Sequence, residues 1–363
     1  MSAARTPVVL DVDTGVDDAL ALLLAARHPA LDLRAVTCVA GNVDVDQVLV
    51  NTLTVLTAAG RADVPVARGM DRPLLEPARA ARHVHGEDGM GDLGPSSPPP
   101  SQLPGRLEPD PRHAVQLLRD VLLAAARPGA GPKVTLLPLA PMTNIALLLR
   151  MHPEVAAGLE RIVFMGGAAF TGNATAAAEF NVWHDPESVA VVLDAAAALG
   201  VPVTMYGLDV FYDVRVGRDR ARALAASADP AASLAGRLVE YQCDRFGVEQ
   251  ATIGDAGAVC AVVDPAGLTV EPLPVRIELA GTWTRGQTVV DRRLDRSSGG
   301  TDQDHDPHGL AATVVDVALA VDAVRYADLW VDAVTGGGTG TGAAGQVSGA
   351  AAPTAPTGGP SAG

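Results

Sequence analysis

Short apolar segments rich in β-branched residues alternate along the chain with longer segments whose apolar residues recur at helical spacing. The short segments predict strands at 8–12, 33–39, 64–67, 134–137, 162–165 and 201–205. The longer ones predict helices at 17–27, 45–59, 111–126, 143–151, 186–198 and 218–226. This alternation predicts an α/β fold, with a mainly parallel, open sheet that carries helices on both faces. Ligands bind such sheets beyond the carboxyl ends of the strands, so residues that directly follow a strand are the first candidates for function.

Four carboxylates occur within eight residues where the first predicted strand passes into the first predicted helix. Asp11 and Asp13 share one face of the strand because side chains alternate along it, and Asp17 and Asp18 fall in the first helical turn. Helix capping explains one or two of them. Four like charges around one point are costly unless a cation compensates them. The cluster therefore predicts a metal site, and its oxygen-only ligands favour a hard ion, Ca²⁺ or Mg²⁺.

The charge of the chain limits its partners. The formal net charge is −15 over 363 residues, of which 48% are hydrophobic. An acidic surface repels phosphate backbones and anionic lipids, so nucleic acid and membranes are not expected as partners. A neutral substrate or a cation is compatible with this charge.

Cysteine usage and the start of the chain predict the compartment. Cys38, Cys243 and Cys260 are odd in number and far apart, which predicts buried free thiols in a reducing compartment. The first residues leave no room for a signal peptide, and no apolar run approaches the ~18 residues of a membrane helix. We therefore expect a cytoplasmic protein.

Several segments have a structural interpretation. Residues 1–335 are expected to form one domain, with an exposed Pro-rich loop at about 94–105 and a disordered Gly/Ala/Pro/Thr tail at 336–363. Segment 285–291 is interpreted as a structural hairpin. Asp185, which is followed by proline, is interpreted as the N-cap of a helix.

The acidic segment 9–21 and a series of later motifs, in this order along the chain, resemble those of the inosine-uridine-preferring nucleoside hydrolases. The later motifs are the strand and Asn at 35–42, the His-Gly loop at 85–89, the Thr-Asn-Ile-Ala element at 141–146, the Gly-Gly, Gly-Asn, Glu-Phe-Asn and Asp-Pro-Glu block at 165–187, and Gly-Asp-Ala at 254–256. One acidic cluster is weak evidence, but several motifs in the family's order are specific. The resemblance implies hydrolysis of the N-glycosidic bond of ribonucleosides to ribose and free base.

The resemblance also implies a calcium site and a catalytic base. Ca²⁺ is expected at the carboxylates of Asp13, Asp18 and Asp255 and at the backbone carbonyl of Thr143. A Ca²⁺-bound water would attack C1′ of the sugar, with Asp13 as the acceptor of its proton. Such a site suits N-glycoside cleavage, because the reaction passes through an oxocarbenium-like sugar that is stabilised by neighbouring negative charge.

The remaining matched residues imply a ribose subsite. The residues expected to bind substrate are polar and match the ribose hydroxyls: Asp17, Asn42, Asn173, Glu179, Asn181 and Asp255. Asp17 is expected at the 2′-hydroxyl, Asn173 and Glu179 at the 5′-hydroxyl, and Asn181 at the 3′-hydroxyl, with Asp11 in support of the cluster. Such a pocket rejects deoxyribose, because a missing hydroxyl leaves buried polar groups unpaired. The resemblance further implies a homodimer or homotetramer and a role in purine or pyrimidine salvage.

One position departs from the family pattern. Many members have a His directly before the last metal-binding Asp, where it is thought to protonate the departing base, and this chain has Gly254. Three substitutes are open. His85 could act on the leaving base, an aromatic residue such as Tyr241, Phe246 or Trp283 could stack on it, or solvent could protonate it. We expect His85 to contribute to this step.

Two other classes of function account for part of the same residues. A haloacid-dehalogenase-like phosphatase also has a strand followed by Asp-x-Asp, as at Asp11 and Asp13, and a late Gly-Asp element for Mg²⁺. It needs a lysine shortly before that element, whereas the only lysine, Lys133, lies over a hundred residues earlier. The second alternative is a ribose- or nucleoside-binding relative with weakened catalysis, which the glycine at position 254 suggests.

Overall fold

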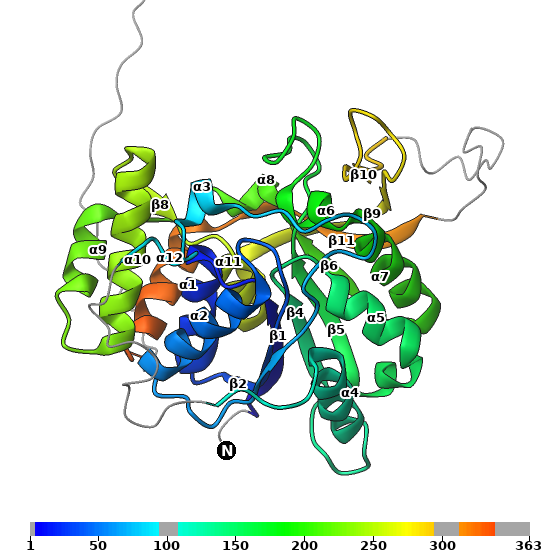
Figure 1. The fold of residues 1–363 in the computed structure, drawn as a ribbon, viewed down its shortest axis with the longest axis horizontal. Helices are drawn as coiled ribbons and strands as arrows, with labels where there is room; N and C mark the ends of the chain where they lie inside the picture. The colour runs from blue at the N-terminus through cyan, green and yellow to red at the C-terminus, as the bar shows by residue number, and fades with distance from the viewer. Residues whose placement is uncertain (1–3, 94–107, 294–311, 338–363) are drawn as a thin grey trace, which may run out of the picture.

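A nine-stranded sheet runs through the centre of the computed structural model, which describes residues 4–93, 108–293 and 312–337 (Figure 1). The strand order is β10-β9-β11-β6-β5-β4-β1-β2-β3. The strands are β1 (Thr6–Val12), β2 (Leu31–Cys38), β3 (Val66–Arg68), β4 (Val134–Pro138), β5 (Leu159–Met165), β6 (Val203–Tyr206), β9 (Leu268–Ile277), β10 (Thr288–Val290) and β11 (Thr313–Val321). The predicted loop at about 94–105 and the predicted tail beyond residue 337 lie outside the described residues.

The sheet is mainly parallel. Neighbouring strands from β3 through β2, β1, β4, β5 and β6 to β11 are parallel. At the other edge β9 is antiparallel to β11, and β10 is antiparallel to β9. The predicted mainly parallel, open sheet is therefore confirmed, with an antiparallel pair added at one edge.

Helices cover both faces of the sheet because its strands are apolar on both sides. Side chains alternate along β1, so Val8, Leu10 and Val12 enter one core and Val9 enters the other. The first core is completed by α1 (Val16–Arg27), α2 (Val45–Ala58), α10 (Pro230–Phe246), α11 (Ala256–Val263) and α12 (Ala323–Val334). The second core is completed by α4 (Ala114–Ala125), α5 (Thr143–Met151) and α7 (Pro186–Leu199). The predicted helices on both faces are confirmed.

Short elements gather where the parallel strands end. They include the helices α3 (Arg82–His85), α6 (Phe180–His184) and α8 (Leu208–Phe211), which lie along one edge of the sheet in Figure 1. Beside them β7 (Arg215–Gly217) and β8 (Gln250–Thr252) form an antiparallel ribbon. The remaining elements are α9 (Arg218–Ala225) and the 3-10 helices η2 (Pro153–Gly158) and η3 (Pro265–Gly267). The carboxyl edge of the sheet is therefore covered by loops and short helices that can carry functional side chains.

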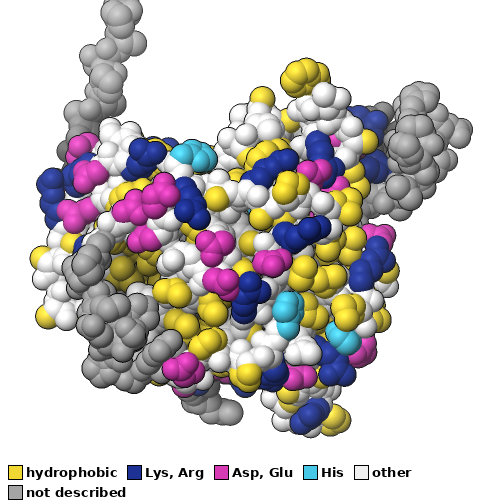
Figure 2. Space-filling model, in the orientation of Figure 1, with side chains coloured by type: hydrophobic (Ala, Val, Ile, Leu, Met, Phe, Trp, Pro, Cys, Tyr) yellow, Lys and Arg dark blue, Asp and Glu magenta, His cyan; other side chains and the backbone are white. Residues whose placement is uncertain are grey.

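Several local predictions are confirmed. Asp185 is the N-cap of α7, and its Oδ1 accepts a hydrogen bond from Ser188 N at 3.1 Å. Segment 285–291 contains β10, which forms a hairpin with β9 by antiparallel pairing. The three cysteines are buried and free. Within the described ranges, no helix is both long enough and apolar enough to cross a membrane. On the face drawn in Figure 2, arginine side chains lie interspersed among acidic ones.

Candidate active site

A cavity of about 560 Å³ opens at the carboxyl ends of the central strands. Eight of the predicted site residues line it: Asp13, Asp17, Asn42, His85, Asn173, Glu179, Asn181 and Asp255. Asp18 and Thr143 are fully buried and do not line it. The structure thus brings together residues that are far apart in the sequence, because β1, β2, β4 and β5 are adjacent parallel strands.

Three carboxylates converge beside this cavity, and two of them, Asp17 and Asp255, line it. Asp17, Asp18 and Asp255 each offer one oxygen, and these oxygens lie within 4.8 Å of one another. Asp17 and Asp18 stand in the first turn of α1, and Asp255 precedes α11 without using its side chain as a cap. Two helix starts therefore aim carboxylates at one point, and oxygens at this spacing can hold a hard cation.

Asp13 lies beside this cluster and is held by Asn42. Its Oδ2 accepts from Asn42 N at 2.8 Å, and its Oδ1 accepts from Asn42 Nδ2 at 3.2 Å. The same amide group donates to Asp18 Oδ2 at 3.3 Å. The converging set thus contains Asp17, which was expected at the sugar, and not Asp13, which was expected at the metal. Gly15 permits this packing, because a Cβ there would lie 2.6 Å from Asn42 Nδ2.

Burial and mutual repulsion disfavour the ionised carboxylates. Burial, together with the charge of Asp17, raises the pKa of Asp18 to about 7. Burial and the neighbouring aspartates raise the pKa values of Asp13 and Asp255 well above their usual range. A cation bound among them would favour the ionised forms. The cluster therefore has the electrostatics of a cation site.

Asp11 supports the cluster from the interior. Its Oδ1 accepts hydrogen bonds from Thr37 Oγ1 at 2.6 Å and from Asn144 Nδ2 at 2.8 Å. Its Oδ2 has no hydrogen-bond partner among the described residues, and burial raises its pKa to about 7. Asn144 also donates to Cys38 O at 3.0 Å, so β1, β2 and α5 are joined beneath the cavity.

Glu179 is buried in the wall of the cavity and caps α6. Its carboxylate accepts from the backbone N–H groups of Gly167, Asn181 and Val182 at 2.8–3.1 Å. Burial nevertheless raises its pKa to about 7. Three backbone donors thus fix the orientation of this buried side chain.

The two asparagines near Glu179 are also fixed. Asn181 Nδ2 donates to Leu139 O at 3.0 Å and to Met165 O at 3.3 Å, which leaves its Oδ1 free of these contacts. Asn173 Oδ1 accepts from Phe180 N at 2.9 Å. Both side chains are held by backbone groups and face the cavity.

The hydroxyl of Thr143 has a partner that sequence reasoning missed. Thr143 Oγ1 donates to Asp185 Oδ2 at 2.5 Å, and Leu74 N donates to the same oxygen at 3.1 Å. Asp185 therefore caps α7 and also holds the start of α5. Only its capping role was visible in the Asp-Pro sequence.

A family model described as inosine-uridine preferring nucleoside hydrolase matches residues 8–328, which is most of the chain. The chain belongs to this family. The pyrimidine-specific ribonucleoside hydrolase RihA of Photobacterium profundum is 39% identical to it over 291 residues, 79% of this chain and 89% of that protein. The inosine-uridine preferring nucleoside hydrolase of Leishmania major is 38% identical over 294 residues, 80% of this chain and 88% of that protein. The solved structure of a purine-preferring ribonucleoside hydrolase from Gardnerella vaginalis matches with a TM-score of 0.76 at 26% identity, over 91% of this chain and 98% of that chain.

This nucleoside hydrolase is therefore an enzyme that hydrolyses the N-glycosidic bond of ribonucleosides. The family and the reaction predicted from the motifs are confirmed. The alternative of a haloacid-dehalogenase-like phosphatase is wrong, because the family match extends over nearly the whole chain and not only over the Asp-x-Asp segment.

His85 of the nucleoside hydrolase is held as a neutral imidazole. Its Nδ1 accepts a hydrogen bond from Val16 N at 3.1 Å, so its proton resides on Nε2. The same Nδ1 lies 3.7 Å from Asp17 Oδ1, but burial outweighs this charge and lowers the pKa of His85. At neutral pH the ring can donate a hydrogen bond and is not an imidazolium acid.

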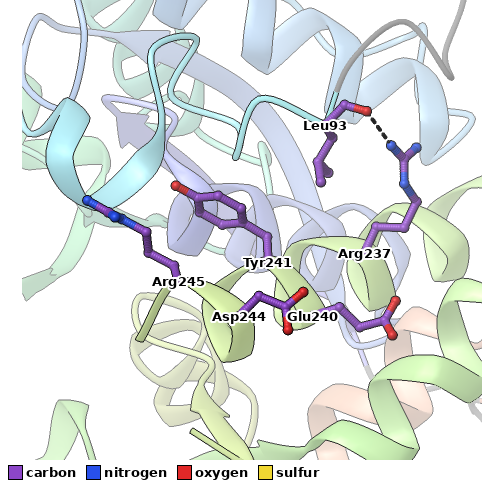
Figure 3. A pocket seen from close by; sticks show the side chains of 6 residues that line it. All are labelled: Leu93, Arg237, Glu240, Tyr241, Asp244 and Arg245. Atoms are coloured by element: carbon purple, nitrogen blue, oxygen red, sulfur yellow. Dashed lines mark hydrogen bonds between the residues drawn. The ribbon is translucent and has the colours of Figure 1, made fainter. Parts of the chain in front are cut away.

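Helix α10 holds the short helix that carries His85. Tyr241 Oη donates to Val84 O at 3.2 Å, and the Arg245 guanidinium donates to His83 O. Figure 3 shows these side chains pointing from α10 toward the α3 segment. They line a second hollow along α10, in which Arg237 donates to Leu93 O. Tyr241 therefore positions α3 and does not line the cavity.

The wall of the cavity also contains apolar and amide side chains to which the motifs assign no role. Phe180, Trp183, Phe211, Tyr212 and Phe246 line it, and so does Gln242. Gln242 is 6% exposed. Of the aromatic candidates named from the sequence, only Phe246 lines the cavity. Trp283 is 88% exposed on the loop between β9 and β10.

The pKa shifts of this nucleoside hydrolase predict how its stability depends on pH. Asp11, Asp18 and Glu179 have pKa values raised to about 7, so the folded chain binds protons that the unfolded chain has already lost. Stability then falls as pH rises, by about 1.4 kcal/mol per pH unit for each proton released on unfolding. Below about pH 6.5, His85 and His184 have the opposite effect. Their pKa values are lowered in the folded chain, so the unfolded chain binds more protons at these residues and stability falls as pH falls.

The measurement is the thermal midpoint in chelator at pH 6.5 and at pH 8.0. We expect the midpoint to be several degrees lower at pH 8.0. Saturating Ca²⁺ should reduce this difference, because a bound cation stabilises the ionised carboxylates. A midpoint in chelator that rises between the two pH values contradicts the prediction.

Proposed function

We propose that this nucleoside hydrolase acts on pyrimidine ribonucleosides, with uridine as the leading substrate, and that Ca²⁺ is its cofactor. The observation that carries the proposal is the convergence of carboxylate oxygens from Asp17, Asp18 and Asp255 beside a cavity that Asp17 and Asp255 line. Asp13 and the backbone carbonyl of Thr143 complete the proposed ligand set. The residues fit Ca²⁺, which takes six to eight oxygen ligands in flexible geometry and so leaves room for hydroxyl groups of a substrate.

Asp13 is the proposed base. Ca²⁺, when bound, supplies positive charge that lowers the pKa of a nearby water and orients the ribose diol. Asp13 takes the proton of the attacking water at a carboxylate oxygen. The water oxygen bonds to C1′ while the bond from C1′ to the base breaks, and its electron pair leaves with the base. Asn42 holds Asp13 at 2.8 and 3.2 Å, so the proton acceptor is oriented before substrate binds.

Glu179, Asn173 and Asn181 are the proposed ribose ligands. Each is anchored by backbone groups, so the subsite is formed before substrate arrives. Glu179 and Asn173 bind the 5′-hydroxyl, and Asn181 binds the 3′-hydroxyl. Asp17 binds the 2′-hydroxyl. The aspartates nearby also stabilise the positive charge that develops on the sugar in the transition state.

Two observations support a pyrimidine as the leaving base. The imidazole of His85 is neutral, so it can donate a hydrogen bond from Nε2 but does not supply the proton that a purine needs. Uracil leaves as an anion whose charge is spread over two carbonyl oxygens, and donors such as His85 and the Gln242 amide suit these oxygens. The name of the Photobacterium profundum relative states specificity for pyrimidines.

Replacing His85 by alanine should lower kcat/KM for uridine about 10- to 100-fold, because a hydrogen bond to a charged group contributes ~1.5–3 kcal/mol. The p-nitrophenyl riboside should be much less affected, since its leaving group departs without assistance. The two kcat/KM values, measured at saturating Ca²⁺, check this expectation. If the His85→Ala enzyme keeps its kcat on both substrates, His85 has no part in the departure of the base.

A ribose-release panel tests the proposed function. Uridine, cytidine, inosine, adenosine and guanosine are assayed with Ca²⁺ and with chelator. We expect the fastest release from uridine and loss of activity in chelator. Faster release from the purine nucleosides contradicts the proposed substrate, and tight nucleoside binding without release of sugar indicates the weakened binding relative.

The quaternary structure and the cellular role stay predictions. A homodimer or homotetramer is expected in solution, which light scattering coupled to size-exclusion chromatography measures. A cytoplasmic location and a role in pyrimidine salvage are expected with it.

A further inference from the structure

Gly254 stands where many members of the family have a histidine, and its surroundings leave no room for a side chain. Its φ is +52°, in the left-handed region that favours glycine. A Cβ at this position would lie 2.6 Å from Asp17 Cβ and 2.9 Å from Phe211 Cζ. The space that a side chain at position 254 would enter is therefore already filled by Phe211 and Asp17.

Phe211 is fixed in this place by the loop that contains Gly254. Thr252 Oγ1 donates to Phe211 O at 2.7 Å, and Gly254 N donates to Thr252 Oγ1 at 3.0 Å. The Phe211 ring also packs edge-on against Tyr212, with the ring centroids 5.0 Å apart. Its side chain is only 7% exposed and lines the cavity, whereas Gly254 is buried and does not. The end of α8 and the loop after β8 are thus joined by hydrogen bonds through Thr252.

We propose that Phe211 binds the leaving base by contacting it beside Asp17, and that residue 254 is glycine because the ring occupies its space. This inference rests on the proposed function, in which Asp17 binds the 2′-hydroxyl next to C1′. The base of a bound nucleoside then lies against an apolar ring and receives no proton from position 254. Contact between an aromatic ring and a base is favourable for every base, but it provides no acid.

The experiment compares a nucleoside with a ligand that lacks the base. KM for uridine and the inhibition constant of free ribose are measured at saturating Ca²⁺ for the wild type and for Phe211→Ala and Phe211→Leu. We expect Phe211→Ala to raise KM about ten-fold and to leave the ribose constant within about two-fold, with Phe211→Leu in between. Phe170→Ala is the matched control, because Phe170 is exposed, packs on Arg292 and does not line the cavity.

The proposal is overturned if Phe211→Ala raises KM for uridine and the inhibition constant of ribose by the same factor. It is also overturned if neither constant changes. If Phe211→Ala does not fold, as judged by circular dichroism, the less disruptive apolar replacement Phe211→Leu decides. Wild-type enzyme that releases ribose from no ribonucleoside refutes the proposed function itself and is a separate result.

A double-mutant cycle tests the pairing with Gly254. Gly254→Ala should lower kcat/KM about 100-fold by displacing Phe211 and Asp17. In an enzyme that already carries Phe211→Ala, Gly254→Ala should lower kcat/KM only about ten-fold, because the contact with the Phe211 ring is gone and only that with Asp17 remains. If the losses in kcat/KM from Gly254→Ala and Phe211→Ala are additive, residue 254 and Phe211 are not coupled and this part of the proposal is wrong.

Discussion

Replacing Asp13 by asparagine is expected to lower kcat for uridine about 10³-fold. A positioned general base contributes about 10²–10⁴ to the rate, and an amide cannot take up the proton. The replacement also sets a new NH₂ group against the donors of Asn42, which now lie at 2.8 and 3.2 Å from the carboxylate, so the side chain loses its orientation. KM should change much less, because Asn173, Glu179 and Asn181 are untouched.

The measurement is kcat at saturating Ca²⁺ and saturating uridine, with the metal content of each variant determined. The matched control is Asp229→Asn. Asp229 is also a carboxylate, but it pairs with Arg27 at 2.6 Å and does not line the cavity. We expect the control to stay within two-fold of wild type. An Asp13→Asn enzyme that keeps its metal and retains more than a tenth of the wild-type kcat contradicts the role of Asp13 as base.

Removal of the cation is expected to abolish activity, and Asp255→Ala is expected to have the same effect even in excess Ca²⁺. The carboxylates of Asp17, Asp18 and Asp255 repel one another, and a bound cation relieves this repulsion. Replacing Asp255 by alanine removes one ligand and so weakens the attraction for the ion. Chelated wild-type enzyme should recover on addition of Ca²⁺, whereas Asp255→Ala should not. Mg²⁺ should restore less activity, because it demands octahedral geometry and keeps its waters.

Thermal unfolding provides a readout that does not depend on catalysis. Ca²⁺ at about a hundred times its dissociation constant stabilises the folded wild type by ~2.7 kcal/mol. The same concentration should leave the midpoint of Asp255→Ala almost unchanged. Full activity of the wild type in chelator, or an equal Ca²⁺ shift in Asp255→Ala, contradicts the proposed metal site.

The parts of the site that lie in contiguous motifs could be predicted from sequence. The Asp13-Thr14-Gly15 turn and the start of α1 are local, so the strand, the turn and the acidic helix start are all visible in nine residues. Parallel strands end on one edge of a sheet, and this rule brought Asp13, Asn42 and Asn173, which follow β1, β2 and β5, to the same cavity.

The part of the cavity that is proposed to contact the leaving base could not be predicted in the same way. Gln242 comes from the C-terminal half of α10 and Phe211 is the last residue of α8, and neither stands in a motif. Tyr241 is adjacent to Gln242 in sequence, yet it points to Val84 O because successive residues of a helix face different directions. The contact of Phe211 with Gly254 depends on the end of α8 and the loop after β8, which meet only in the folded chain.

The antiparallel edge of the sheet shows the same limit of local patterns. Strand β11 pairs antiparallel with β9 and parallel with β6, and β6 lies more than a hundred residues earlier in the sequence, so no local turn signal indicates this pairing. Asp185 is another case, since its proline neighbour indicates a cap but nothing local indicates its hydrogen bond to Thr143.

The most direct test of the account is the rate of sugar release from uridine compared with 2′-deoxyuridine, each with Ca²⁺ and with chelator. The account predicts release from uridine only when Ca²⁺ is present. It also predicts that 2′-deoxyuridine reacts about 10⁴-fold more slowly, because the missing hydroxyl leaves buried polar groups unpaired. Comparable rates for the two nucleosides, or release from uridine that chelator does not affect, would contradict the assignment of Asp17, Asp18 and Asp255 to a cation and a ribose diol.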